Sequence, residues 1–153
     1  MVSAFPTSPI STLWRAIVSA LQTDPVLGAQ IELWQVWQGE DIDLVDVTSD
    51  NLPFLRITPK SSPQDWLDEA AAQITFTLEI KIGVSGTDVT ALFDAWHAVH
   101  TALFTGNTVL NALYPLGVIQ KTITQAAIVP AVYDGASGLE GTGLLRIKTR
   151  INS

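Results

Sequence analysis

The chain has 153 residues, a formal net charge of −7 at pH 7 and no cysteine. A domain of this length can fold without staples, and the absence of cysteine excludes disulfides and thiolate metal sites. The acidic net charge argues against a nucleic-acid binder, because it repels DNA phosphates, but it does not argue against a conduit through which DNA slides without binding.

Charged residues make up 15% of the chain, against about 25% in a typical soluble protein. So few charges predict that part of the surface is buried against other chains, while a monomer with a polar coat rich in Thr and Gln is the alternative. The start, MVSAFPTSPI, lacks the basic region and apolar core of a signal peptide. No run reaches the roughly 18 apolar residues that a membrane span needs.

The N-terminal segment predicts a helix and a short linker. Ser8 can cap the helix, Pro9 suits its first position, and an apolar stripe follows at helical spacing. Pro25 disfavours helical backbone at Asp24 and therefore ends the helix. The stripe consists of Leu13, Trp14, Ile17, Val18 and Leu21, and residues 26–30 form the linker or one further helical turn.

Two strands are predicted next, with an acidic segment between them. Residues 30–38 alternate between the two faces of a strand, and residues 52–58 form another strand that ends at Pro59. The acidic residues of 40–50 are interleaved with apolar ones, which predicts an edge strand or an ordered loop. Residues 60–65 contain Ser-Ser-Pro and predict a loop.

The longest predicted strand covers residues 73–84. Its even-numbered residues are apolar (Ile74, Phe76, Leu78, Ile80, Ile82 and Val84), and its odd-numbered residues are Thr75, Thr77, Glu79, Lys81 and Gly83. Alternation over such a length is typical of a strand with one buried face. At about 3.3 Å per residue the strand spans roughly 40 Å, a length typical of sheets that continue or pack across subunits.

A second helix follows the turn at Ser85-Gly86. Thr87 or Asp88 caps it, and Gly106 suits the left-handed position after its end. Its predicted buried stripe consists of Val89, Leu92, Phe93, Trp96, Val99, His100 and Leu103.

The remainder predicts two strands, 118–129 and 144–152, separated by a loop over 134–143 that holds Gly135, Gly138, Gly141 and Gly143. Four glycines predict that this loop is disordered in the free protein and ordered by a neighbour. The order of elements predicts one α+β domain over residues 1–153. Its sheet is mostly antiparallel, with two main helices packed on one face.

No motif for catalysis, a cofactor or a metal is found. The loop 134–143 lacks the P-loop lysine and the dinucleotide fingerprint, and the aspartates of 41–46 lack the Gly and Glu of a calcium loop. His97 and His100 lack a third ligand at suitable spacing, and His100 is predicted to be a core residue. We therefore predict a protein that is not an enzyme and has no catalytic residue, cofactor or metal.

The layout of the whole chain carries a family resemblance. An amphipathic helix ends at Thr23-Asp24-Pro25, a short strand ends at Pro59, and the segment QITFTLEIKIGVSGTD (73–88) leads directly into the helix 89–104. The final strand contains RIKTRI (146–151). In these features the chain resembles the tail terminator (tail completion) proteins of tailed bacteriophages.

The resemblance implies a structural virion protein that forms a hexameric ring at the head-proximal end of the tail, after assembly in the host cytoplasm. Such a ring caps the tail tube, ends its polymerisation and joins it to the head or neck. The implied partners are further copies, the tail tube protein, a neck or head-connector protein and, in a contractile tail, the sheath. DNA is only passing cargo, and no membrane is involved. The alternatives are another neck or baseplate component, and a small-molecule-binding or enzymatic α+β domain.

The candidate interface residues come from charge and flexibility. Arg146, Lys148 and Arg150 alternate along the last strand and so share one face, where three like charges repel unless they are countered. We predict that this face meets acidic surface on the next subunit or on the tube. A solvated face with Glu79 and other acids nearby is the alternative, and contact with DNA is a weaker one, since three cations on a chain of net charge −7 release few counterions. The remaining candidates are Glu79, Lys81, Gly135, Gly138, Gly141 and Gly143.

Overall fold

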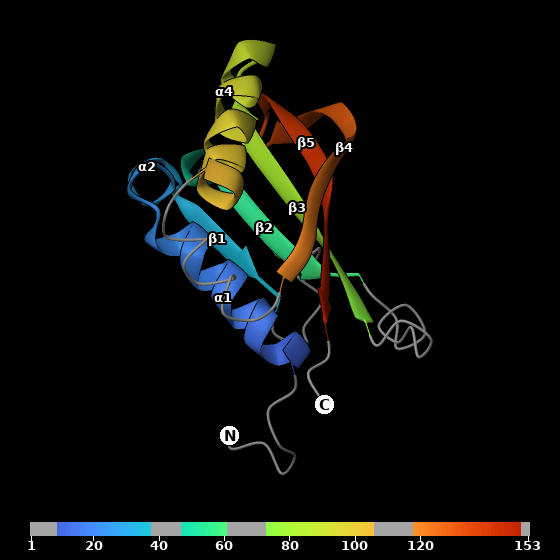
Figure 1. Cartoon of the computed structure of the whole chain (residues 1–153). Helices are drawn as coiled ribbons and strands as arrows, with labels where there is room; N and C mark the ends of the chain where they lie inside the picture. The colour runs from blue at the N-terminus through green and yellow to red at the C-terminus, as the bar shows by residue number, and fades with distance from the viewer. Residues whose placement is uncertain (1–8, 38–46, 61–72, 106–117, 151–153) are drawn as a thin grey trace.

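The computed structural model describes residues 9–37, 47–60, 73–105 and 118–150. They form a five-stranded sheet in the order β1-β2-β3-β5-β4, with the helices α1 and α4 on one face (Figure 1). Only the β1–β2 pair is parallel, and the other neighbouring pairs are antiparallel. The predicted class, α+β with a mostly antiparallel sheet and two main helices on one face, is confirmed.

The first helices meet at Asp24. Helix α1 covers Pro9–Thr23, as predicted, and α2 covers Pro25–Gln30, so the segment after Pro25 is the further helical turn. The Asp24 carboxylate accepts hydrogen bonds from the N–H groups of Val26 and Leu27, at 3.2 and 3.0 Å. These bonds cap α2 and fix the direction of the chain between the two helices.

The next elements include the two predicted strands. Strand β1 covers Leu33–Val36, which is shorter than the predicted 30–38, and β2 covers Phe54–Pro59. A 3-10 turn at Ser49–Asn51 precedes β2. The residues 40–46 of the acidic segment and residues 61–65 of the predicted loop lie outside the described part of the chain.

Strand β3 confirms the prediction from alternation. It covers Gln73–Ser85, and its described even-numbered residues, Phe76, Leu78, Ile80, Ile82 and Val84, are buried. They face the two helices, where Ile17 and Leu21 of α1 complete the core. The ring of Trp14 meets Phe76 edge to face, with centroids 6.4 Å apart, and so joins α1 to the sheet.

Helix α4 covers Val89–His100 and continues into a π-helical turn at Thr101–Thr105. Asp88 is its cap and accepts hydrogen bonds from the N–H and the hydroxyl of Thr90. These two bonds lower the pKa of Asp88 below its ordinary value. Gly106, the predicted end of the helix, lies outside the described residues.

The predicted buried stripe of α4 is partly wrong. Leu92, Val99 and Leu103 are buried and Trp96 is half-buried, but Val89, Phe93 and His100 are exposed. Residues 92, 96, 99 and 103 follow a spacing of four, three and four and lie on one line along the helix. The three exposed residues lie beside this line, so the apolar stripe of the sequence is wider than the surface that the sheet covers.

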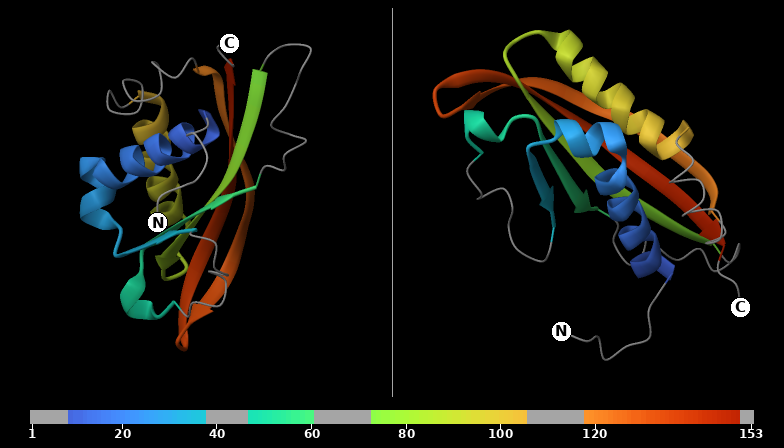
Figure 2. Two further views of the ribbon diagram at one scale, coloured as in Figure 1. Left: turned by 90° about the horizontal axis from the view of Figure 1, so that it is seen from below. Right: turned by 90° about the vertical axis from the view of Figure 1, so that its left-hand side faces the viewer.

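The predicted loop over 134–143 is also wrong. Strands β4 (Val118–Tyr133) and β5 (Ala136–Arg150) form one long hairpin, joined by a turn at Asp134 and Gly135 alone. The φ angles of these two residues are 52° and 81°, as a tight hairpin turn requires. Gly138, Gly141 and Gly143 lie in β5 and pair with β3 and β4, so the predicted disorder of this segment is corrected to regular strand. Figure 2 shows the hairpin along one side of the twisted sheet.

Candidate interface surfaces

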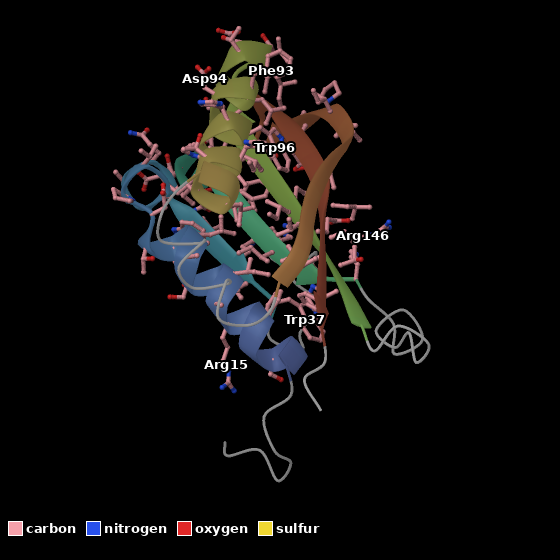
Figure 3. The ribbon with its side chains drawn as sticks, in the orientation of Figure 1. Arg15, Trp37, Phe93, Asp94, Trp96 and Arg146 are labelled. Carbon is pink, nitrogen blue, oxygen red and sulfur yellow. The ribbon has the colours of Figure 1, made fainter. Side chains whose placement is uncertain are left out.

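Helix α4 lies against β5 through one tryptophan and two glycines. A Cβ at Gly141 would lie 2.4 Å from Nε1 of Trp96, and a Cβ at Gly143 would lie 2.7 Å from the indole carbon Cη2. Figure 3 shows Trp96 on the side of α4 that faces β5. The two glycines therefore leave the space that the indole fills. Helix α4 can approach the sheet closely only because both positions lack a side chain.

The far face of the sheet carries a small aromatic cluster. Phe54 of β2 is fully buried, and its ring meets that of Tyr133 edge to face, with centroids 6.0 Å apart. A Cβ at Gly83 would lie 2.1 Å from the Phe54 ring, and one at Gly138 would lie 2.5 Å from the Tyr133 ring. Phe54 and Gly83 are register partners, so the aromatic rings pack where the strands carry no side chain. The cluster holds the end of the hairpin against β2.

Tyr133 is fixed at its polar end as well. Its hydroxyl donates a hydrogen bond of 2.5 Å to Glu140 on the neighbouring strand. Burial raises the pKa of Tyr133 above its ordinary value, and the hydrogen bond to Glu140 and the charge of that carboxylate raise it further. The neutral phenol is therefore the form that the fold selects.

A buried polar pair lies next to this cluster. Nε of Arg56 donates a hydrogen bond of 2.8 Å to Oε1 of Gln35, and both side chains are buried. The Arg56 guanidinium also lies 5.4 Å from the centre of the Phe54 ring. The amide nitrogen of Gln35 is buried and has no hydrogen-bond partner. A buried donor without a partner lowers the stability of the fold.

The charged candidates of the sequence lie on the same far face. Arg146 is exposed between the buried Leu145 and Ile147, and it points away from the helices (Figure 3). Its register partner on β3 is Thr77, and Glu79 is the partner of Leu144. Within the described part of the chain, the ion pair of Glu79 is with Lys60, at 3.9 Å.

The other basic candidates are placed by their backbone. Lys148 and Arg150 belong to β5 and pair with Thr75 and Gln73 of β3, at alternate positions from Arg146. The structure places the backbone of these two residues and does not describe their side chains. Lys81 is half-buried and pairs with Thr142 and Arg56, so it lies on the same sheet face as Arg146. The prediction that this face meets an acidic partner stays a prediction.

An apolar groove lies on the helix side of the molecule, between α2 and α4. Its volume is about 510 Å³, and its floor includes Val84 and Pro53. The wall formed by α4 consists of Ala91, Asp94, Ala95 and Ala98, and the opposite wall of Val26, Leu27, Gln30 and Ile31. Small side chains on α4 leave this space open, and Asp94 is its single charged group among the described lining residues.

Several large apolar side chains are exposed. Val132, next to the hairpin turn, is 73% exposed, Val26 is 58% exposed and Phe93 is 50% exposed. Figure 3 shows Phe93 and Asp94 on different flanks of α4, so the helix presents an apolar edge on one flank and the groove on the other. These three residues belong to three different elements, and single exposed apolar side chains of this kind are ordinary on a protein surface.

The histidines and acids form no metal centre in the part of the chain that the structure describes. His97 and His100 are both exposed, so the predicted core position of His100 is wrong. No group of three or more His, Asp or Glu side chains in the described ranges lies close enough to bind a metal ion. None of the described helices has the length and apolar character needed to cross a membrane.

Sequence reasoning missed the aromatic cluster and the groove. Tyr133 and Phe54 are far apart in sequence, and neither lies in a motif. The sequence signal that could have indicated this packing is the set of glycines at positions 138, 141 and 143, because a glycine within a strand often marks the close approach of another group.

A scan against protein-family models finds no match to the chain, and a search of curated proteins finds none either.

Proposed function

We propose that this chain is a structural subunit that forms a ring with copies of itself and acts as the tail terminator of a tailed bacteriophage. The ring caps the tail tube, ends its polymerisation and joins it to a neck or head-connector protein. In a contractile tail it also meets the sheath. DNA passes through as cargo, and the subunit performs no catalysis.

One observation supports this proposal: the subunit exposes two chemically different surfaces, one on each side of a single sheet. Both main helices cover one face, and that side has the groove beside α4 and the exposed Phe93. The other face carries Arg146 and Lys81 with no helix over them among the described residues. A subunit with two different contact surfaces assembles head to tail, which gives a closed ring when the rotation between copies closes.

The small fraction of charged residues and the acidic net charge of the chain support the same function. The whole chain has 8 basic and 15 acidic residues, so its net field repels DNA and does not hold it. This property is compatible with a ring through which DNA moves, whereas a nucleic-acid binder needs the opposite.

The test is electron microscopy of the protein mixed with its tail tube protein. We expect rings at one end of the tubes and tubes that stop growing once they are capped. A control with an unrelated acidic protein of similar mass should leave tube growth unchanged. Tubes that grow normally and carry no rings would contradict the proposal.

A second function has one observation in its favour, the apolar groove of about 510 Å³ with a carboxylate in its wall. This volume is within the range of small-molecule sites. A small-molecule-binding domain would stay monomeric, and its ligand would raise the melting temperature of the wild type but not of Ala95→Trp, which fills the groove. Ring formation without any small molecule would favour the structural function.

A further inference from the structure

The groove between α2 and α4 combines an apolar interior with one carboxylate in its wall. Asp94 stands in its wall, and Glu32 and Asp88 come within three positions of the lining residues Ile31 and Ser85. All three acids are exposed. No Lys or Arg is found among the described residues that line the groove. An occupant of this groove should therefore combine an apolar side chain with positive charge.

The far face of the sheet offers this combination. Leu144 is half-buried there, with Arg146 two positions further along β5 and Lys81 on the neighbouring strand β3. The acid opposite Leu144 is Glu79, which lies 3.9 Å from the ammonium of Lys60, so its charge is already partly balanced. This part of the far face is an apolar residue flanked by two cations, and we name it the Leu144 surface.

The groove and the Leu144 surface lie on opposite sides of the sheet. The groove is formed by the helices, whereas Arg146 points away from them, and Figure 3 shows Asp94 and Arg146 far apart on the molecule. The two surfaces of one copy therefore cannot meet each other. They can meet between copies, and each copy then uses its groove toward one neighbour and its Leu144 surface toward the other.

We propose that the groove between α2 and α4 is the docking site for the Leu144 surface of a second copy of this chain. Leu144 enters the apolar groove, and Arg146 lies against Asp94 of the neighbour. The contact is heterologous, so it does not stop at a dimer, and it forms a ring when the rotation between copies closes. This inference rests on the proposed function, because it names the contact by which the ring forms.

Charge reversal tests the contact, with sedimentation of the purified full chain as the readout, alone and with tail tube protein. Asp94→Lys and Arg146→Glu should each weaken association at least about tenfold, because each places like charges together. The double variant carries both reversals and should recover most of the association. Added salt should weaken association of the wild type.

Matched controls separate charge from contact. Asp134→Lys at the hairpin turn and Arg15→Glu on α1 make the same changes of charge outside both surfaces and should assemble as the wild type does. Ala91→Trp at the groove should block association without any change of charge. Thermal unfolding of every variant shows that the domain is folded.

The outcomes distinguish this inference from the proposed function. Rings of the wild type together with normal rings of Asp94→Lys and Arg146→Glu would overturn the docking site and leave the terminator function standing. A double variant as weak as the single variants would also overturn the pairing of Arg146 with Asp94. A wild type that stays monomeric with tube protein present would contradict the proposed function and the docking site together.

Discussion

The indole nitrogen of Trp96 occupies space that a side chain on Gly141 would need, since a Cβ there would lie only 2.4 Å from it. This relationship sets the distance between α4 and the sheet. It thereby also fixes the wall of the groove that faces α2, because Asp94 and Ala95 precede Trp96 on the same helix.

Gly141→Ala should lower the free energy of unfolding by about 1–3 kcal/mol, because the added methyl group forces Trp96 out of its place. Chemical denaturation checks this, and the fluorescence maximum of the native protein should shift as the indole becomes more exposed. Gly28→Ala in helix α2 is the control, because its Cβ would lie 3.4 Å from the nearest atom, the carbonyl oxygen of Gln22. That change should leave stability equal or raise it by about 0.5–1 kcal/mol. Equal stabilities of Gly141→Ala and the wild type would contradict the packing described.

Strand β3 and the glycines of β5 show which parts of the fold can be predicted from the sequence and which cannot. The alternation in β3 was enough to predict a strand and its buried face, because burial on one side leaves a period of two in any sequence. The pattern of Gly138, Gly141 and Gly143 predicts a flexible loop, since glycine has the same local signature in a loop and under a packed ring. The rings that distinguish the two cases are those of Trp96 over Gly141 and Gly143 and of Tyr133 over Gly138.

The candidate site was predicted in part for a similar reason. Period two placed Arg146, Lys148 and Arg150 on one face, and the backbone register of β5 agrees with this. The groove depends on the distance between α2 and α4, and that distance cannot be predicted from the local sequence pattern of either helix. The predicted stripe on α4 is too wide because apolar residues such as Phe93, which is 50% exposed, also lie outside the buried side of the helix.

Tyr133 predicts a specific loss of stability at high pH. Its pKa is raised above the ordinary value of 10.0, so below that pH the residue is neutral in the folded and the unfolded chain. As pH rises above about 10, the unfolded chain ionises first and stability falls. Tyr133→Phe should lose less stability over that range, and at neutral pH it should be about 1 kcal/mol less stable, because Glu140 loses its donor. Parallel losses in the two proteins above pH 10 would contradict this.

Gln35→Glu should remove the unpartnered amide nitrogen and place a carboxylate against Arg56. We expect stability at neutral pH to equal or exceed that of the wild type, because a buried donor without a partner disappears and Arg56 gains an opposite charge. The new carboxyl should have a lowered pKa, so the gain should be lost as the pH falls through that value. Gln35→Met is the control, and it should be about 1–3 kcal/mol less stable because Arg56 loses an acceptor. A glutamate variant as unstable as the methionine variant would show that the pair is misassigned.

Hydrogen exchange should show slow exchange for residues 138–147 of the free subunit. These residues pair with β3 on one side and β4 on the other, so their amides lie in the interior of the sheet. The amide of Gly135 in the turn should exchange fast in the same sample. Fast exchange throughout 136–143 in the free protein would restore the loop that the sequence alone predicts.

Analytical ultracentrifugation at micromolar concentration, with and without tail tube protein, measures whether the subunit forms a ring. We expect a closed ring of about six copies, either in the protein alone or on contact with tube protein. A species that sediments as a monomer of 16.5 kDa under both conditions would contradict it.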